Sequence, residues 1–327
     1  MDFRQAIREG LTEAMSKDAR VVMFGEDVAV AGGVYQATRG LYEHFGPTRV
    51  FDTPISEMAL AGAAFGSALC GLRPVVEIMY GDFLPLAMDS LINQASKYWF
   101  VSNEQSSVPL VVRSAVGGGN RLGPIHSQIA APWFMSVPGL KIVAPSMPSD
   151  AMGLIIAAVA DDNPVLFLEH KRLYGLKGEI DHNISASLGQ ASIVRVGQDL
   201  TVVTAMASVH DALRAADSLA AHHIDLEIID LRSLRPFDAP TILNSVAKTR
   251  RLLVVEEGPR TGGWAAEVLA TVVESSALDL DDAWRLTSPD LPLPYSPLIE
   301  DDFLPGRDKI IQTVLSHLAP PSHSISK

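Results

Sequence analysis

Short apolar runs alternate along the first half of the chain with longer segments that have helical periodicity. Strands are predicted where apolar runs are bounded by glycine, proline or charged residues, at residues 20–25, 73–79, 108–113, 140–145 and 165–169. Helices are predicted at residues 1–10, 57–69, 85–101 and 151–160. Strands and helices that alternate in this way indicate a mostly parallel sheet with helices on both faces.

The same alternation returns in the second half of the chain after a break. Periodicity lapses over residues 171–190 and resumes with strands at 199–204, 224–230 and 252–256 and helices at 208–221, 239–248 and 264–275. A chain of 327 residues is long enough for two domains. We therefore expect an α/β protein with domains at 1–180 and 191–327 and a linker at 181–190. A proline-rich tail predicts an extended segment before a short terminal helix.

Charge and cysteine content narrow the classes of function. The chain has 38 acidic and 26 basic residues and a net charge of −12, which argues against a nucleic-acid surface. Its one cysteine, Cys70, lies in an apolar stretch, so it is expected to be a small buried residue and not part of a disulfide. The most apolar run is too short to span a membrane, and no signal-peptide core is seen. A cytoplasmic protein is expected.

One stretch, Asp52 to Ala59, places an acid at the start of an unusual helix. Pro54 disfavours helix before it, Ser56 is a candidate cap, and Glu57 begins the helix. The helix carries many small residues, with Gly62 and Gly66 on one face where another backbone could approach. Two roles remain open for Glu57, stabilisation of the helix dipole or a function in a site.

Other candidate residues lie in loops that follow predicted strands. Glu26 and Asp27 follow the strand at 20–25, at the edge of a parallel sheet where ligands collect. His126 lies in the glycine-rich loop 117–128, and such loops often serve function. This histidine is compatible with acid–base catalysis, metal binding or a hydrogen bond to a backbone carbonyl.

Several common phosphate and nucleophile motifs are missing from the sequence. The run Gly117-Gly118-Gly119 lacks the third glycine of a dinucleotide motif, and there is no P-loop, nucleophile elbow or cysteine metal site. An α/β chain without its own phosphate cradle suggests that a partner chain supplies one.

Seven short motifs occur in the order and spacing of a known family over nearly the whole chain. They are Phe24-Gly25-Glu26-Asp27-Val28, Asp52-Thr53-Pro54-Ile55-Ser56-Glu57, Gly71-Leu72-Arg73-Pro74-Val75, His126-Ser127-Gln128, Pro138-Gly139-Leu140-Lys141, Asp162-Asn163-Pro164-Val165 and Asp230-Leu231-Arg232-Ser233-Leu234. The chain thus resembles the beta subunit of the thiamine-diphosphate-dependent, decarboxylating component of 2-oxo acid dehydrogenase complexes. The resemblance implies a thiamine-diphosphate-binding fold, with a pyrimidine-binding domain and a transketolase C-terminal-like domain.

The resemblance also implies roles for individual residues. Glu57 matches the acid that hydrogen-bonds N1′ of the aminopyrimidine and favours its imino tautomer. Phe83 matches the aromatic residue that stacks on this ring, and Met79 lies against it. Glu26 matches an acid near the cofactor at the subunit interface. His126 matches the histidine that assists transfer of the acyl group to the lipoyl arm.

Metal ions and partners follow from the same resemblance. Carbonyl groups in the family can hold a structural potassium ion; here these residues are Leu110, Ala158, Val159, Asp161 and Asn163. The Gly-Asp-Gly signature that binds Mg²⁺ and the diphosphate is absent here and belongs to the alpha subunit in the family. We therefore expect an α2β2 heterotetramer with a cofactor at each α/β interface, and a lipoyl-bearing acyltransferase as a further partner.

Substrate and reaction class remain open at this stage. Ile125 and Tyr80-Gly81-Asp82 depart from the pattern of many relatives and lie where substrate choice is shaped. Pyruvate, a branched-chain 2-oxo acid and acetoin are all compatible with the sequence. A split transketolase-like carboligase subunit and a non-catalytic scaffold subunit are the alternatives to a dehydrogenase.

Overall fold

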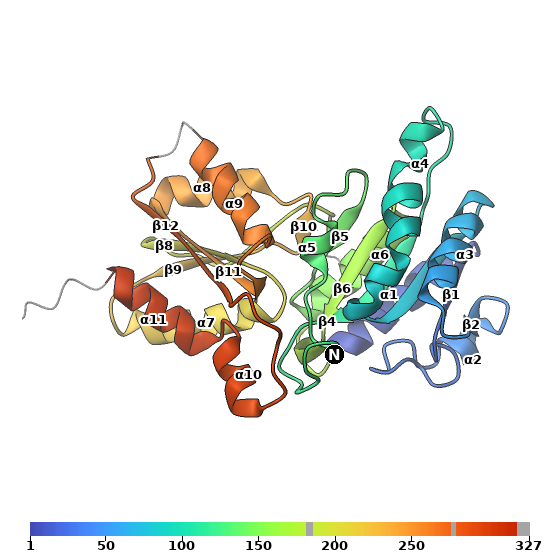
Figure 1. Ribbon diagram of the computed structural model, residues 1–327, viewed down its shortest axis with the longest axis horizontal. Helices are drawn as coiled ribbons and strands as arrows, with labels where there is room; N and C mark the ends of the chain where they lie inside the picture. Colours follow the sequence, from blue (N-terminus) through green and yellow to red (C-terminus); the bar gives the residue numbers. More distant parts are fainter. Residues whose placement is uncertain (181–185, 276–278, 319–327) are drawn as a thin grey trace, which may run out of the picture.

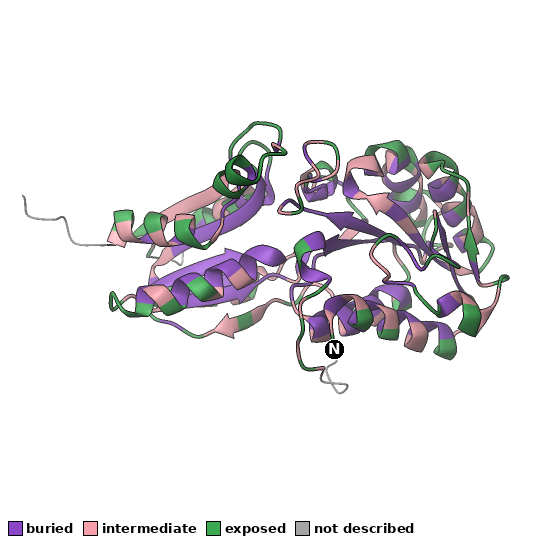
Figure 2. Cartoon of the chain, turned by 90° about the horizontal axis from the view of Figure 1, so that it is seen from below, coloured by how far each residue is buried: buried purple, intermediate pink, exposed green. Residues whose placement is uncertain are grey.

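Two α/β lobes lie side by side in the structure (Figure 1). It is a computed structural model that describes residues 1–180, 186–275 and 279–318. Each lobe is built on one β-sheet, and Figure 2 shows buried strands between layers of helices. The predicted two-domain α/β fold class is confirmed.

The first sheet has seven strands in the order β10-β5-β6-β4-β3-β1-β2. Its strands are β1 (Val21–Gly25), β2 (Val50–Asp52), β3 (Arg73–Tyr80), β4 (Val111–Val116), β5 (Lys141–Val143), β6 (Val165–His170) and β10 (Ser233–Arg235). All neighbouring pairs are parallel except β10 and β5. Central strands such as β4 and β6 are buried along their whole length, which explains why apolar residues make up most of each sequence.

Helices cover both faces of this sheet. Those of the first lobe are α1 (Phe3–Lys17), α2 (Leu41–Phe45), α3 (Glu57–Leu69), α4 (Ser96–Val101), α5 (Ala131–Phe134) and α6 (Pro148–Ala160), with the short helices η1 (Gly81–Ala87), η2 (Asp89–Ala95) and η3 (Lys171–Leu173). Helices α1 and α6 pack against each other, whereas α3 packs against β3, η1 and η2. A capping box between Asp2 and Gln5 begins α1.

The second sheet has five strands in the order β12-β11-β8-β9-β7. They are β7 (Ser192–Arg195), β8 (Leu200–Thr204), β9 (Leu226–Asp230), β11 (Arg251–Pro259) and β12 (Asp282–Ser288). The helices of this lobe are α7 (Ala207–Ala220), α8 (Ala239–Thr249), α9 (Trp264–Glu274), α10 (Pro297–Phe303) and α11 (Arg307–Leu318). Helices α8 and α9 lie on one side of this sheet and α7 and α11 on the other (Figure 1).

Two predicted elements of the first lobe differ from the structure. The single helix expected at 85–101 is instead a 3-10 helix, a π-helix and a short α-helix in succession. Pro85 lies inside the first of these and has no N–H to donate, which disfavours a regular α-helix. The strand expected at 108–113 is β4 at residues 111–116, since Pro109 cannot donate to a sheet ladder.

The two ends of α3 also correct expectations from the sequence. Ser56 is the N-cap residue, but its hydroxyl makes no capping hydrogen bond. Cys70 was expected to be buried and is exposed, because it stands at the C-cap, beyond the last turn of the helix. Only its backbone is held there, by hydrogen bonds to the carbonyl groups of the final turn.

The second half of the chain contributes to the first sheet. Strand β10 follows β9 and pairs antiparallel with β5 at the sheet edge, which the sequence pattern did not predict. Residues 181–185 of the predicted linker lie outside the described residues, so the boundary at 181–190 stays a prediction. Within the described ranges, no helix is long and apolar enough to cross a membrane.

Candidate functional site

The carboxyl ends of six parallel strands lie at one edge of the first sheet. Register pairs Gly25 at the end of β1 with Asp52 at the end of β2, and Val116 of β4 with His170 of β6. The loops that leave this edge carry the predicted site residues; these are Glu26 after β1, Glu57 after β2, Phe83 after β3 and His126 after β4. Ligands of open parallel sheets bind at such an edge.

Glu57 and Glu26 form the acidic part of this edge. Glu57 is half-buried in the first turn of α3, where the helix dipole favours a negative charge. Burial raises the pKa of the half-buried Glu26 carboxyl, and the negative charges of Asp27 and Glu57 raise it further. Of the two acids, Glu26 has the raised pKa and therefore takes up a proton more readily than an ordinary glutamate.

An aromatic cluster forms the other part of the site. The ring of His126 lies 4.6 Å from that of Tyr80 and 5.5 Å from that of Phe83, measured between centroids, and both contacts are edge-to-face. Tyr80 and Phe83 also contact each other edge-to-face at 5.9 Å. A half-buried cluster of this kind offers flat faces to a planar ring and an ionisable imidazole beside them.

Met79 lies in an irregular part of β3 directly before this cluster. The pairing of β3 with β4 shifts register between Ile78 and Tyr80, so Met79 is the extra residue of a bulge. Bulges re-aim side chains and are common next to active sites. Met79 itself is half-buried.

The loop that carries His126 is anchored by hydrogen bonds at several points. The ammonium of Lys171, the first residue after β6, donates to the backbone carbonyl of His126. The side-chain amide of Gln128 donates to Asp82 at 2.8 Å, and the Gly117 N–H donates to the Gln128 carbonyl at 3.3 Å. Within the described residues, no group of three or more His, Cys, Asp or Glu side chains could hold a metal ion.

Two residues that contact His126, Lys171 and Tyr80, were not predicted as site residues from the sequence. Lys171 follows a predicted strand at the ligand-binding edge of the sheet, and this position alone could have identified it as a candidate site residue. Tyr80 was noted only as part of a variable turn. Lys171 and Tyr80 lie 45 and 46 positions from His126 in the sequence, and local periodicity does not predict contacts over such separations.

The glycine-rich loop after β4 is filled by carboxylates of the second lobe. Gly118 N–H donates to Glu257 at 2.6 Å and Gly119 N–H donates to Glu300 at 2.7 Å. Glu257 also contacts His170 at 2.9 Å. Burial alone would raise the pKa of Glu257, but His170 and the Gly118 N–H together lower it to about 2. The amides of Gly118 and Gly119 therefore serve the contact between lobes and do not face a phosphate group.

The residues implied in potassium binding lie together near the start of β4 and β6. Val159 and Asp161 direct their carbonyl groups to the Arg73 guanidinium, which donates to them at 2.9 and 3.0 Å. The Leu110 carbonyl accepts from the Val165 N–H at 2.8 Å. Ala158 is in the last turn of α6, and Asn163 follows that helix. A carbonyl oxygen has two lone pairs, so these groups retain acceptor capacity, and the potassium site stays a prediction.

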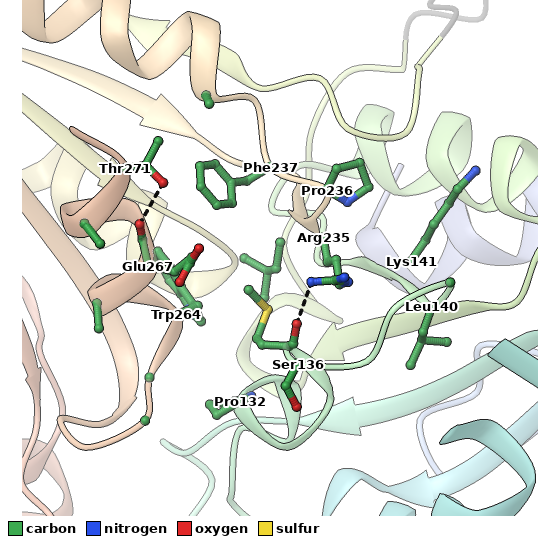
Figure 3. Close-up of a pocket in the computed structure, with 18 of the residues that line it drawn as sticks. Pro132, Ser136, Leu140, Lys141, Arg235, Pro236, Phe237, Trp264, Glu267 and Thr271 are labelled. Atoms are coloured by element: carbon green, nitrogen blue, oxygen red, sulfur yellow. Dashed lines mark hydrogen bonds between the residues drawn. The ribbon is translucent and has the colours of Figure 1, made fainter. Parts of the chain in front are cut away.

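A cavity away from this edge lies between the two lobes. It has a volume of about 1220 Å³, and its walls include Pro132, Leu140, Phe237 and Trp264 (Figure 3). Its lining contains none of the predicted catalytic or cofactor-binding residues. A second cavity of about 590 Å³ adjoins the His126 loop and is lined by Ser127, whose buried hydroxyl has no hydrogen-bond partner within the described ranges.

Comparison with protein families matches both halves of the chain. Residues 1–177 match the family described as transketolase, pyrimidine binding domain, and residues 189–310 match transketolase, C-terminal domain. A solved structure described as a split gene transketolase, inactive beta4 tetramer, aligns with a TM-score of 0.81 over 97% of both chains. Its sequence identity is 18%, so this likeness shows the fold alone.

Curated proteins are more closely similar in sequence. The chain is 43% identical over 314 residues to the 2-oxoisovalerate dehydrogenase subunit beta of Bacillus subtilis (strain 168), covering 95% of this chain and 96% of that protein. It is 41% identical over 338 residues to the acetoin:2,6-dichlorophenolindophenol oxidoreductase subunit beta of the same organism, covering 98% of each. It is 43% identical over 318 residues to the mitochondrial pyruvate dehydrogenase E1 component subunit beta-1 of Arabidopsis thaliana, covering 95% and 88%.

Proposed function

Since the chain belongs to the family of transketolase-like beta subunits of 2-oxo acid and acetoin dehydrogenases, we propose that it works with an alpha subunit as the decarboxylating component of such a dehydrogenase. The reaction is oxidative decarboxylation of a 2-oxo acid, or cleavage of acetoin, with transfer of the acyl group to lipoyl on an acyltransferase. The single observation that carries this proposal is that Glu57, Phe83 and His126 follow strands whose carboxyl ends lie at one sheet edge, with the rings of Phe83 and His126 in contact.

The residues of this edge fit the aminopyrimidine half of thiamine diphosphate, the cofactor of transketolase-family decarboxylating components. Helix α3, which begins with Glu57, packs against η1, which carries Phe83. A carboxylate and an aromatic face are therefore available on neighbouring elements, as a polar planar ring requires. Bound there, thiamine diphosphate supplies a carbon nucleophile that attacks the substrate carbonyl.

Each residue has a distinct role in this proposal. Glu57 accepts a hydrogen bond from the pyrimidine ring and holds it in the reactive tautomer, while Phe83 and Met79 fix the plane of the ring. Glu26, with its raised pKa, exchanges protons near Glu57. His126 holds a proton at its imidazole and assists transfer of the acyl group to the lipoyl sulfur.

The second half of the cofactor site is assigned to a partner chain. The sequence lacks the Gly-Asp-Gly signature for Mg²⁺ and diphosphate, and the amides of Gly118 and Gly119 are occupied by Glu257 and Glu300. We assign Mg²⁺ and diphosphate to the alpha subunit and the assembly to an α2β2 heterotetramer. A structural potassium ion at the carbonyl groups near Asp161 and a cytoplasmic location belong to the same proposal.

The test is reconstitution with the alpha subunit encoded in the same genome. The chain alone and the co-purified complex are assayed for thiamine-diphosphate-dependent ferricyanide reduction with pyruvate, 3-methyl-2-oxobutanoate and acetoin. We expect turnover only in the complex, with a preference for one of the three substrates. Full activity of the chain alone would contradict the shared site, and activity with ketose phosphates in place of these substrates would indicate a split transketolase.

A further inference from the structure

Lys171 is a buried cation beneath the loop that carries His126. Its side chain leaves the carboxyl end of β6, and the residue is 4% exposed. The ammonium donates to the His126 backbone carbonyl and lies 5.5 Å from the centroid of the Tyr80 ring. Lys171 therefore contacts the backbone of His126 and also one of the two rings against which the imidazole packs.

The buried ammonium group of Lys171 has no ion-pair partner among the described residues. No carboxylate of the described residues lies within ion-pair distance of its ammonium, although Asp82, Glu257 and Glu300 are near enough to favour the charged form. Burial is the largest effect and lowers the pKa of Lys171 to about 8. Burying an ammonium group without a close ion pair is costly, which argues that the residue is retained for more than stability.

A second contact holds the same loop from the opposite side. Asp82 in η1 accepts hydrogen bonds from the Gln128 side chain at 2.8 Å and from the Gln128 N–H at 3.3 Å. The segment from His126 to Gln128 is thus anchored at its first residue by Lys171 and at its last by Asp82. The imidazole between them has little freedom to leave the faces of Tyr80 and Phe83.

We propose that Lys171 is a positioning residue that holds the His126 imidazole in place for acyl transfer to the lipoyl group. This inference rests on the proposed function. Transfer depends on the position of a general acid or base to within about 1 Å, where a misplacement can cost on the order of 100-fold in rate. Ferricyanide reduction needs no lipoyl group, whereas acyl transfer does, so the two steps can be measured separately.

The test uses Lys171→Met in the reconstituted complex, since methionine keeps the length of the side chain and removes its charge and its donors. We expect acyl transfer to a lipoyl domain to fall about 10- to 100-fold, while ferricyanide reduction, which needs no lipoyl group, changes less than about twofold. Lys171→Arg, which keeps the cation and its N–H donors, is expected to retain more transfer than Lys171→Met. Lys177→Met, at an exposed lysine, is the control and should change neither rate.

A double-mutant cycle with His126→Ala separates positioning from general destabilisation. If Lys171 acts through His126, adding Lys171→Met to His126→Ala causes no further loss of acyl transfer. Additive losses, equal losses in both assays, or unchanged transfer in Lys171→Met would each overturn the proposal. An unmodified complex that fails with all three substrates would overturn the proposed function and this inference together, whereas an active complex isolates the result for Lys171.

Discussion

Glu57 combines two features that an acid in a helix seldom shares. It occupies the first turn of α3, where the dipole stabilises a negative charge, and its charge acts on the half-buried carboxyl of Glu26. A purely structural acid at a helix start needs no second acid nearby. The pair supports the role proposed above for Glu57, which the sequence alone left open.

Glu57→Gln is expected to reduce turnover of the reconstituted complex by about 100- to 10,000-fold, because the amide cannot accept or release a proton in the way a carboxylate does. Assembly should be unchanged, since glutamine has almost the same shape. The measurements are ferricyanide reduction and sedimentation velocity. Glu9→Gln, at an exposed position of α1, serves as the matched control. Loss of the complex in the Glu57 variant would return this residue to a structural role.

Helix α3 presents a small residue, Gly66, at a position that its own chain leaves open. A Cβ atom added at Gly66 would meet no atom within 4 Å, and one at Gly62 would lie 3.7 Å from Ser90 Oγ. Ile55 and Met58, beside Glu57, are 73% and 67% exposed. We expect a partner chain to pack on this face, since apolar side chains of this size are costly to leave in water.

Gly66→Leu therefore tests whether a partner chain packs on α3. In the chain alone, the substitution should leave the free energy of unfolding unchanged or raise it by about 0.5–1 kcal/mol, because glycine disfavours helix interiors. In the presence of the alpha subunit, the bulky side chain should prevent assembly. Denaturant unfolding and size-exclusion chromatography give the two readouts, with Gly66→Ala as the milder variant. Normal assembly of Gly66→Leu would place the alpha subunit on another face.

At the scale of the whole molecule, polar groups buried between the two lobes hold them together. The Ser146 hydroxyl donates to the Asp230 carboxyl, and Glu257 joins His170 to the glycine loop. Strand β10 adds backbone hydrogen bonds across the same boundary. Two of these contacts depend on carboxyl groups, those of Asp230 and Glu257, whose charge changes with pH.

Asp230 provides the pH-dependent prediction. Burial raises the pKa of Asp230 to about 7, with a further contribution from the charge of Asp150, whereas in the unfolded chain it is near 3.8. The folded state therefore binds a proton that the unfolded chain releases, and stability falls as pH rises from about 4 to about 7 and then levels off. Each pKa unit corresponds to about 1.4 kcal/mol.

Asp230→Asn should remove the loss of stability that occurs as pH rises from about 4 to about 7, because the amide side chain does not ionise. The Tm of the variant should exceed that of the unmodified chain at pH 8, and the difference should vanish near pH 4. Thermal unfolding at pH 4, 6 and 8 measures the effect. Asp302→Asn, at a side chain that is 86% exposed, should show no such trend. A constant difference across pH would mean that the carboxyl is already neutral, or already ionised, over the whole range.

Part of the site could be predicted from local sequence because position at a sheet edge follows from strand order. Apolar runs that end in glycine or acid mark the carboxyl ends of strands, so Glu26 and His126 could be assigned to loops at a ligand-binding edge. Glu57 followed from the proline and serine before it. Motif spacing then indicated the family, which the comparisons confirm.

By itself, the sequence determined the α/β alternation, the two halves, the family and the loops that carry the predicted site residues, because these depend on periodicity and on motifs of a few residues. The tertiary structure alone decided that β10 joins the first sheet, that Glu257 and Glu300 fill the glycine loop, and that Lys171 lies under His126. These contacts join residues 45 to 181 positions apart. They arise when whole helices and strands pack together. This packing decides which side chains meet, and local sequence does not.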